Sequence, residues 1–419
     1  MLRCSIAVLC LLFFESQISA ADWPEFLGPG GSAKSTDVVP LTWGETENIT
    51  WKVDLPGTGS SSPIVVGDKV VVTCYLTGEN NSKRVVLCFD KNSGEQLWSV
   101  DFPIDYKEDR YQGYITEHGY ASNTPVSDGE NVYVFLGKAG VHSITLDGTK
   151  NWSVDVGKES SNRQWGSAAS LILFQQSVIV NASEESQSII ALDKITGEKI
   201  WTQQASMLEL TYGTPRIVTL DDGEQEVVIS VPSELWSLNP MTGKLNWYCQ
   251  TPMTGNVCPS VIIDGQTVYS FGGYQGSGSI AVQAGGKDDV TNSHTVWTSR
   301  TSSYIATPLL HDDRFYWIDD KGIAYCTSAN DGEIIYRKRV AGLGGGRPVY
   351  ASPILIGDHI YIVTRRDGTI VYPPGDEFQP TQRNVIASDE TDFNASPAVS
   401  DNRLYLRSNK SLYCISATK

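Results

Sequence analysis

Short apolar runs alternate with polar turns along almost the whole chain. Runs such as GDKVVVT at residues 67–73, DGQTVYSF at 264–271 and GDHIYIV at 357–363 start at a Gly/Asp turn and continue as a mostly apolar segment. Side chains of a strand alternate between its two faces, and Gly/Asp turns favour hairpins. Because helical periodicity is almost absent, the pattern predicts antiparallel β-sheets.

A second marker precedes these runs: a small residue, then Pro, then an apolar strand. It starts at Ser62, Thr124, Thr214, Cys258, Thr307, Ser352 and Ser396. The segment GSAASLILF at residues 166–174 is a degenerate eighth copy with Ala168 in the place of Pro. Most of these markers lie about 40 to 50 residues apart, and repeats of this length are typical of a β-propeller. We therefore predict an all-β, eight-bladed propeller with four-stranded antiparallel blades.

An eleven-residue motif ends most of the repeats. Its clearest copy, ALDKITGEKIW at residues 191–201, has a small residue, Asp, Gly and Trp at positions one, three, seven and eleven. We expect Gly197 to supply a positive φ in the turn and Asp193 to accept backbone N–H groups there. We predict that the terminal aromatic residues pack between blades as structural residues: Trp51, Trp98, Trp152, Trp201, Trp247, Trp297 and Tyr336.

The two ends of the chain complement each other. The last repeat stops at residues 411–419 without a fourth strand, whereas residues 48–55 form a spare strand that contains Trp51. We predict that this strand completes the blade that begins at Ser396 and so closes the ring. The predicted domains are a signal peptide at 1–21, an N-terminal extension at 22–47 and the propeller at 48–419.

The first 21 residues have the three parts of a secretory signal: Arg3, an apolar stretch at 6–14 and the small residues Ser19, Ala20 and Ala21. No lipid-attachment Cys follows the cleavage site. We therefore expect cleavage near Ala20 or Ala21 and a soluble product in the periplasm or outside the cell.

Six Cys follow residue 21, in what would be an oxidising compartment. Cys88, Cys326 and Cys414 occupy the small position of the motif, which favours buried thiols. Two disulfides stay open at this point, Cys74–Cys88 across a hairpin and Cys249–Cys258 across a loop. No Cys spacing typical of a metal site occurs.

The formal net charge is −16 and the isoelectric point is about 4.8. This balance excludes a nucleic-acid partner, which would require basic surface. No segment after residue 21 is long and apolar enough to span a membrane. The acidic turns lack the ligand spacing of calcium loops, so we predict no metal site. We expect a monomer.

The eleven-residue motif is similar to the tryptophan-docking motif of the pyrroloquinoline quinone (PQQ) propellers, and the resemblance covers essentially the whole chain after residue 21. The segment ADWPEFLGPGG at 21–31 also looks like the one preceding the first blade in that family. The family includes quinoprotein alcohol dehydrogenases, which hold PQQ and calcium on the axis. It also includes the outer-membrane assembly scaffold BamB, which has neither cofactor nor catalysis.

The resemblance implies an exported, non-catalytic binding or scaffold propeller of the cell envelope, with a protein or small-molecule ligand that it does not identify. The alternative is a PQQ-dependent redox enzyme, the only case in which PQQ and calcium are expected. Against it, the dehydrogenases are much longer, many carry adjacent bonded Cys that are missing here, and their calcium and base residues do not map onto this sequence. We predict no catalytic residue.

A ligand would contact the mouth of the central channel, where loops enter the innermost strands. Aromatic, basic and His residues gather in these loops: His118, Tyr120, Arg163, Trp165, Tyr212, Tyr304, Arg347 and Tyr350. Trp165, Tyr212 and Tyr350 are expected to share one register. Such a ring suits a ligand platform, although the same residues could instead plug the channel. Two insertions, at 103–119 and 272–294, are further candidates for function.

Overall fold

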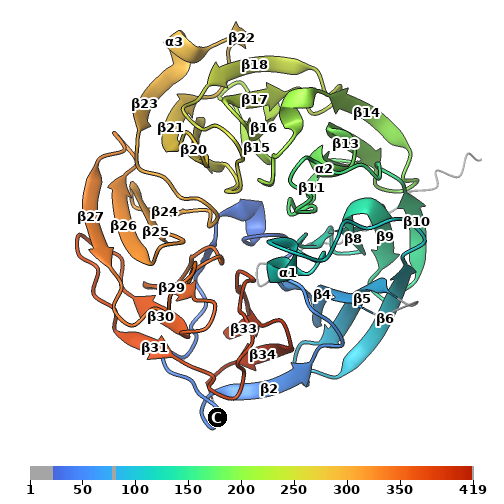
Figure 1. The fold of residues 1–419 in the computed structure, drawn as a ribbon, viewed down its shortest axis with the longest axis vertical. Helices are drawn as coiled ribbons and strands as arrows, with labels where there is room; N and C mark the ends of the chain where they lie inside the picture. Colours follow the sequence, from blue (N-terminus) through green and yellow to red (C-terminus); the bar gives the residue numbers. More distant parts are fainter. Residues whose placement is uncertain (1–21, 78–81, 418–419) are drawn as a thin grey trace, which may run out of the picture.

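The computed structural model describes residues 22–77 and 82–417, which form eight β-sheets arranged around one axis (Figure 1). Neighbouring strands within the sheets are antiparallel, apart from two short strands added at sheet edges. The predicted eight-bladed propeller is therefore confirmed. The predicted signal peptide at 1–21 lies outside the described residues.

We number the blades in chain order, with the strand nearest the axis first in blades 1 to 8. Blade 1 contains β3 (Ile64–Val66), β4 (Lys69–Leu76), β5 (Lys83–Asp90) and β6 (Gln96–Pro103), and blade 2 contains β7 (Val126–Ser127), β8 (Asn131–Phe135), β9 (Val141–Thr145) and β10 (Lys150–Val154). Blade 3 contains β11 (Ile172–Phe174), β12 (Ser177–Ala182), β13 (Ser188–Asp193) and β14 (Lys199–Gln204). Blade 4 contains β15 (Arg216–Thr219), β16 (Gln225–Val231), β17 (Glu234–Leu238) and β18 (Leu245–Gln250).

Blade 5 contains β19 (Ile262–Asp264), β20 (Thr267–Gly272), β21 (Gly278–Gln283) and β23 (Thr295–Ser299), and blade 6 contains β24 (Leu309–His311), β25 (Arg314–Ile318), β26 (Ile323–Ser328) and β27 (Ile334–Arg339). Blade 7 contains β28 (Ile354–Ile356), β29 (His359–Val363), β30 (Thr369–Tyr372) and β31 (Gln382–Asn384). Blade 8 contains β32 (Ala398–Ser400), β33 (Arg403–Arg407), β34 (Ser411–Ile415) and β2 (Ile49–Asp54). The remaining elements are η1 (Pro29–Gly31), β1 (Lys34–Ser35), α1 (Ile115–His118), η2 (Gly137–Ala139), α2 (Ser183–Ser186), η3 (Ser206–Leu208), β22 (Asp288–Asp289) and α3 (Thr291–His294).

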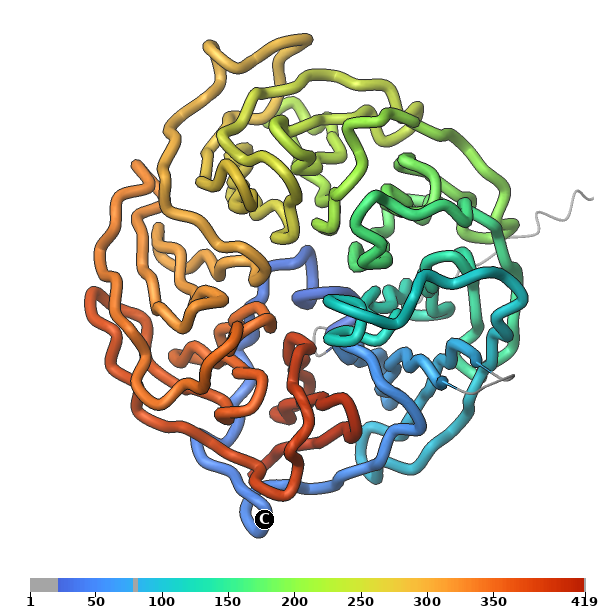
Figure 2. The backbone as a smooth tube through the Cα atoms, in the orientation of Figure 1, coloured from blue at the N-terminus to red at the C-terminus, as the bar shows by residue number. Residues whose placement is uncertain are grey.

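The two ends of the chain close the ring, as predicted. Strand β2 pairs antiparallel with β34, and Trp51 lies opposite Cys414. In Figure 2 the blue N-terminal strand runs beside the red C-terminal blade. Closure gives blade 8 its fourth, outermost strand, so β34 is not left as an exposed sheet edge.

The motif Trp residues dock on the next blade. The indole N–H of Trp201 donates to the Pro240 carbonyl at 2.9 Å, in the turn of blade 4. Equivalent bonds join Trp51 to Lys91, Trp98 to Leu146, Trp152 to Lys194 and Trp297 to Ala329. The turn Gly lies directly under the ring: a Cβ at Gly243 would be 2.4 Å from the Trp201 side chain. The motif Gly therefore has two functions, a positive φ and room for the indole.

The Asp of the motif shapes the same turn, as expected. Asp193 accepts the backbone N–H groups of Ile195 and Thr196 at 2.9 and 2.8 Å, and Asp90 does the same for Asn92 and Ser93. These bonds hold the turn in the conformation on which the neighbouring Trp rests.

Blade 5 departs from this docking scheme because the insertion after β21 replaces its turn. The indole N–H of Trp247 donates instead to buried Glu226 at 2.8 Å, and the same carboxylate oxygen accepts the N–H of Gly285. The second part of the insertion forms β22, which pairs in parallel with β18 of blade 4. The insertion thus covers the outer edge of a neighbouring blade.

A circle of hydroxyl groups joins the blades around the axis. The backbone N–H that starts each inner strand donates to a Ser or Thr hydroxyl at the same place in the next blade, at 2.9–3.1 Å. The seven bonds run from Ser62 to Thr124, Ser170, Thr214, Ser260, Thr307, Ser352 and Ser396 in that order. We call these eight residues the hydroxyl circle.

The circle corrects the predicted register in two blades. Ser170 and Ser260 occupy the marker position in blades 3 and 5. Ser170 lies three residues after Ser167, the residue that precedes Ala168, and Ser260 lies two residues after Cys258. The sequence marker was defined by Pro, whereas the structure selects the hydroxyl, because only the hydroxyl can accept the N–H of the preceding blade.

The junction between blades 8 and 1 carries a buried arginine. Arg407 donates from Nη1 to the Ser61 carbonyl at 2.9 Å and also contacts the Ser61 hydroxyl and the Cys74 sulfur. Its side chain is 1% exposed, and burial lowers its pKa. The guanidinium therefore ties the last blade to the first through neutral acceptors.

The N-terminal extension closes the channel on the side opposite the mouth (Figures 1 and 2). Trp23 is buried and exchanges two 2.9 Å backbone hydrogen bonds with Val65 of β3, and β1 pairs in parallel with β28. Glu25 pairs with buried Arg216 of blade 4 at 3.3 Å. Residues 22–35 thus connect the inner strands of blades on opposite sides of the axis.

All six Cys of the described residues are free thiols. The open Cys74–Cys88 pairing is wrong, because Cys74 lies opposite Val85 and Cys88 opposite Val71 in the β4–β5 hairpin. Cys249 and Cys258 are also unbonded to each other. Cys88, Cys326 and Cys414 are buried, as their small motif position predicts.

The docking glycine supports a stability prediction. Replacing Gly243 by Ala should cost roughly 2–5 kcal/mol, because Ala disfavours a φ of 70° and its Cβ overlaps the Trp201 ring. Gly223→Ala is the matched control, since its φ is 87° but no atom lies within 4 Å of the added Cβ. Urea unfolding measures both variants; equal losses would contradict the docking role.

The hydroxyl circle supports a second prediction. Thr214→Val keeps the shape of the side chain but leaves the buried N–H of Ser170 without its acceptor. We expect a loss of about 1–3 kcal/mol in the free energy of unfolding. Thr214→Ser retains the hydroxyl and should lose distinctly less. If the Val variant unfolded at the same urea concentration as the Ser variant, the bond would not contribute to stability.

Candidate functional site

A cavity of about 210 Å³ lies on the propeller axis, at the side where the chain enters the inner strands. The hydroxyl circle forms one ring of its wall. A second ring lies two residues earlier in each blade: Ser60, Ser122, Ala168, Tyr212, Cys258, Ile305, Tyr350 and Asn394. Phe26 of the N-terminal extension closes the far end. The cavity is therefore built from the same positions of all eight blades.

Six of the eight predicted mouth residues line this cavity: His118, Trp165, Tyr212, Tyr304, Arg347 and Tyr350. Tyr120 does not, because its ring is buried beside Tyr75 and Arg84. Arg163 is exposed and lies outside the cavity, with its guanidinium 5.6 Å from the Trp165 ring centre.

The predicted common register of the three aromatic anchors is correct for Tyr212 and Tyr350 but wrong for Trp165. Ala168 occupies the equivalent position in blade 3. Trp165 instead comes from the preceding loop and stacks on Tyr212, with ring centres 5.9 Å apart. The misplacement follows from the three-residue shift of the marker in that blade.

The first insertion crosses the mouth as a strap, which we define as residues 104–119. Its short helix α1 lies near the centre of the ring in Figure 1. Tyr114, Glu117 and His118 of the strap line the cavity. The sequence identified the insertion by its length, but nothing in its spacing indicated which residues would reach the axis, so Tyr114 and Glu117 were missed.

Two buried ion pairs hold the root of the strap. Arg84 of β5 contacts Glu108, and Lys138 of η2 pairs with Asp109 at 3.2 Å. Arg84 also donates to the Tyr120 carbonyl at the end of the strap. Both cations are buried, so removal of either acid would leave an uncompensated charge.

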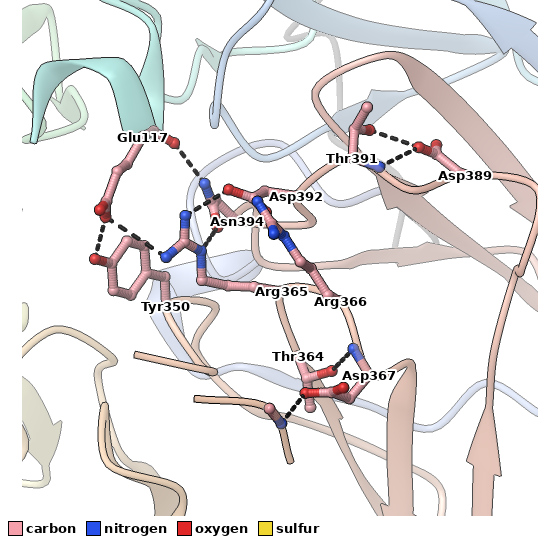
Figure 3. Close-up of polar contacts among 11 residues, drawn as sticks. Glu117, Tyr350, Thr364, Arg365, Arg366, Asp367, Asp389, Thr391, Asp392 and Asn394 are labelled. Carbon is pink, nitrogen blue, oxygen red and sulfur yellow. Dashed lines mark hydrogen bonds and ion pairs between the residues drawn. The ribbon is translucent and has the colours of Figure 1, made fainter. Parts of the chain in front are cut away.

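The tip of the strap is held by residues of blades 7 and 8 (Figure 3). Glu117 accepts the hydroxyl of Tyr350 and lies 3.6 Å from Arg365. Asn394 donates to the Glu117 carbonyl, and Arg365 donates to the Asn394 side-chain oxygen at 2.9 Å. Asp392 pairs with Arg365 and so completes the network. The Oε2 atom of Glu117 thus has two partners, Tyr350 and Arg365.

A continuous arc of aromatic and guanidinium groups surrounds the opening. We call it the aromatic arc, and its members in spatial order are Arg163, Trp165, Tyr114, Arg347, Tyr304 and Tyr274. Tyr114 meets Trp165 edge-on at 5.0 Å, and Arg347 lies 4.3 Å over the Tyr114 ring. These contacts combine planar, amphipathic side chains at one rim.

The charges in the cavity are few. His118 shares a 2.7 Å hydrogen bond with Ser122, and burial lowers the pKa of its imidazole to about 4, so the ring is neutral at pH 7. Glu117 is neutralised by Arg365. Arg347 is the cation of the cavity wall, and Asp320, its nearest carboxylate, lies 3.9 Å away.

These residues do not suit PQQ with calcium. Within residues 22–77 and 82–417, no group of three His, Cys, Asp or Glu side chains is placed to hold a metal ion. PQQ is a tricarboxylate, and the cavity wall offers it one guanidinium. In the part of the chain that the structure describes, no helix is long and apolar enough to cross a membrane.

A second polar cluster lies beside the strap root. Glu184 and Glu185 of α2 are 4% and 2% exposed and accept the hydroxyls of Ser161 and Ser167. Desolvation raises the pKa of each carboxyl to about 7. Both carboxyl groups therefore change between the protonated and the ionised form near neutral pH while the protein stays folded.

Comparison with known proteins gives a consistent result. A sequence model described as "Outer membrane protein assembly factor BamB" matches residues 40–101 and 81–338. The outer membrane protein assembly factor BamB of Burkholderia pseudomallei (strain K96243) is 24% identical over 371 residues, which are 78% of this chain and 87% of that protein.

Two solved structures share the fold. BamB from Moraxella catarrhalis superposes with a TM-score of 0.60 at 15% identity, covering 87% of this chain and 96% of that one. Sqt1 from Chaetomium thermophilum also gives 0.60, at 9% identity and 89% and 99% coverage. At these identities the structural likeness supports the architecture alone.

The buried glutamates generate a pH prediction. Because each folded pKa is raised above its usual value of 4.5, these groups favour the folded state at low pH, and that contribution is lost as pH rises toward about 7. Glu185→Gln should therefore be more stable than the wild type at pH 8, by on the order of 1–3 kcal/mol, with a smaller difference at pH 4.5.

Urea unfolding at several pH values measures this difference. Glu198→Gln, on an exposed turn, is the control and should show the same small offset at every pH. A Glu185→Gln offset that did not change with pH would show that desolvation does not control this carboxyl.

Proposed function

Because the chain belongs to the BamB family, whose sequence model covers residues 40–338, we propose that it is a non-catalytic binding scaffold of the cell envelope. The observation that carries the proposal is the aromatic arc, an exposed platform around the mouth of a propeller of this family. The family description and the signal-like residues 1–21 support an exported protein in the envelope.

The aromatic arc has the composition of a protein-binding hot spot. Tyr, Trp and Arg contribute most of the binding energy at many interfaces, since they are large, rigid and able to donate hydrogen bonds. Tyr114 and Tyr274 are 37% and 55% exposed, and Arg163 is exposed as well. Tyr212, by contrast, is buried in the wall below. The partner should therefore contact the arc, while Tyr212 supports it.

The strap makes this platform rigid. Ion pairs and hydrogen bonds fix its root to blades 1 and 2 and its tip to blades 7 and 8. Side chains held in place before binding lose less conformational entropy when a partner arrives. A fixed aromatic rim is consistent with a scaffold that holds a partner without chemical turnover.

The alternative, a PQQ-dependent dehydrogenase, is less well supported by these residues. Its cofactor would require acidic calcium ligands and several cations around the axis. The cavity wall instead consists mainly of hydroxyl, aromatic and small side chains. We therefore propose that PQQ is not a resident cofactor.

The proposal predicts the effect of a double variant at the arc. Arg163→Ala with Tyr274→Ala removes two exposed members that do not line the cavity. Retention of envelope proteins on the immobilised protein, quantified by mass spectrometry, should fall more than roughly tenfold for the specific partner. The melting temperature should stay nearly unchanged, because neither side chain is buried.

The matched control is Ile195→Ala with Met241→Ala, which removes exposed apolar groups from two outer turns and should leave retention unchanged. Equal retention by the arc variant and the control would contradict the arc as the partner site. Calorimetric binding of PQQ with calcium at micromolar affinity, about −8 kcal/mol, would contradict the scaffold proposal itself.

A further inference from the structure

We propose that the axial cavity below the aromatic arc is a small-molecule site that binds a carboxylic acid with one flat six-membered ring. This inference goes beyond the scaffold function and does not rest on it: the cavity shares Trp165, Arg347 and other members of the aromatic arc, but its hydroxyl circle lies below the rim. Four properties of the cavity carry it: its size, its hydroxyl donors, its aromatic walls and its one guanidinium, that of Arg347.

The size selects a one-ring ligand. A cavity of about 150 Å³ in another protein holds benzene, and this one measures about 210 Å³. The additional space is enough for one small polar substituent on the ring. A large multi-ring ligand would require the strap to leave its ion pairs with Arg365 and the cations at its root.

The hydroxyl circle supplies hydrogen-bond donors. A Ser or Thr hydroxyl has one hydrogen to donate and two lone pairs. In seven residues of the circle, Thr124 to Ser396, a lone pair accepts the N–H of the preceding blade. Among the described residues, none of these seven hydroxyls donates its hydrogen to a protein acceptor, and all seven line the cavity. Their hydrogens are available to a ligand oxygen.

Arg347 adds the charge. Its φ of 51° is rare for a residue other than glycine, and this conformation holds the guanidinium at the mouth of the cavity. Stacking on Tyr114 and Tyr304 orients the planar fork. Because Asp320 is 3.9 Å away, the guanidinium can accommodate a closer anion.

The walls accommodate the ring of the ligand. Trp165 and Tyr212 form a stacked pair on one side, and Tyr304 and Tyr350 belong to the blades across the axis. The cavity thus offers donors and one cation but no free carboxylate, since Glu117 is engaged by Tyr350 and Arg365. This balance favours a carboxylate over an ammonium group.

Calorimetric titration with benzoate and 4-hydroxybenzoate tests the proposal, with benzylamine as the cationic analogue of the same shape. We expect saturable binding of the acids and none of the amine. Arg347→Gln should weaken acid binding by roughly 10- to 100-fold, the effect of losing a charge-assisted hydrogen bond. Arg337→Gln removes an exposed guanidinium that lies over Tyr325, away from the cavity, and should bind the acids as the wild type does.

Cys258 provides a second measurement. It lines the cavity and is the only Cys of the described residues that is not fully buried. Bound acid should slow its reaction with an organomercurial reagent. Cys258→Phe fills the cavity and should abolish acid binding, whereas Cys258→Ser should retain it. Absence of acid binding by the wild type, equal binding of benzylamine, or unchanged affinity in Cys258→Phe would each overturn the proposal.

Discussion

The bond from a backbone N–H to the hydroxyl of the next blade is the interaction on which the rest of the structure depends. It connects the inner strands directly, at a radius where the sheets are narrowest and side chains have least room. The Trp docking contacts lie near the outer edge of the ring, between the last strand of one blade and a turn of the next. Where both contacts occur, as between blades 3 and 4, they hold neighbouring blades at two points and so restrict rotation and sliding of one blade against the other.

The same constraint produces the cavity. Because each blade must place a small hydroxyl residue at the circle, no large side chain can fill the axis at that level. The N-terminal extension and the strap then close the space from its two sides, and the aromatic residues enter from loops above it. A binding space is therefore a by-product of how the ring is held together, and the chemistry of its wall follows from the residues that the ring requires.

The sequence was sufficient to predict the blades, their number and the closure, because these depend on local patterns that recur in every repeat. Of the eight mouth residues predicted from the sequence, six line the cavity, because the loops that carry them precede the recurring marker. The sequence failed where the determinant was not periodic. The marker was defined by Pro, so its predicted position lies three residues before Ser170 and two residues before Ser260. Tyr114 and Glu117 were missed because the path of the strap depends on Arg84, Lys138 and Arg365, which are far apart in sequence.

The pairing of β2 with β34 also constrains the order of folding. Residues 49–54 and 411–415 are separated by nearly the whole chain, whereas the contacts within each blade are local. Local contacts form quickly and long-range ones late. The eighth blade therefore stays incomplete until the C-terminal residues have been synthesised, and until then Trp51 and the free edge of β2 remain exposed to other chains. A protein built in this way needs protection of its N-terminal strand until the last blade is complete, because an unpaired strand edge is prone to aggregation.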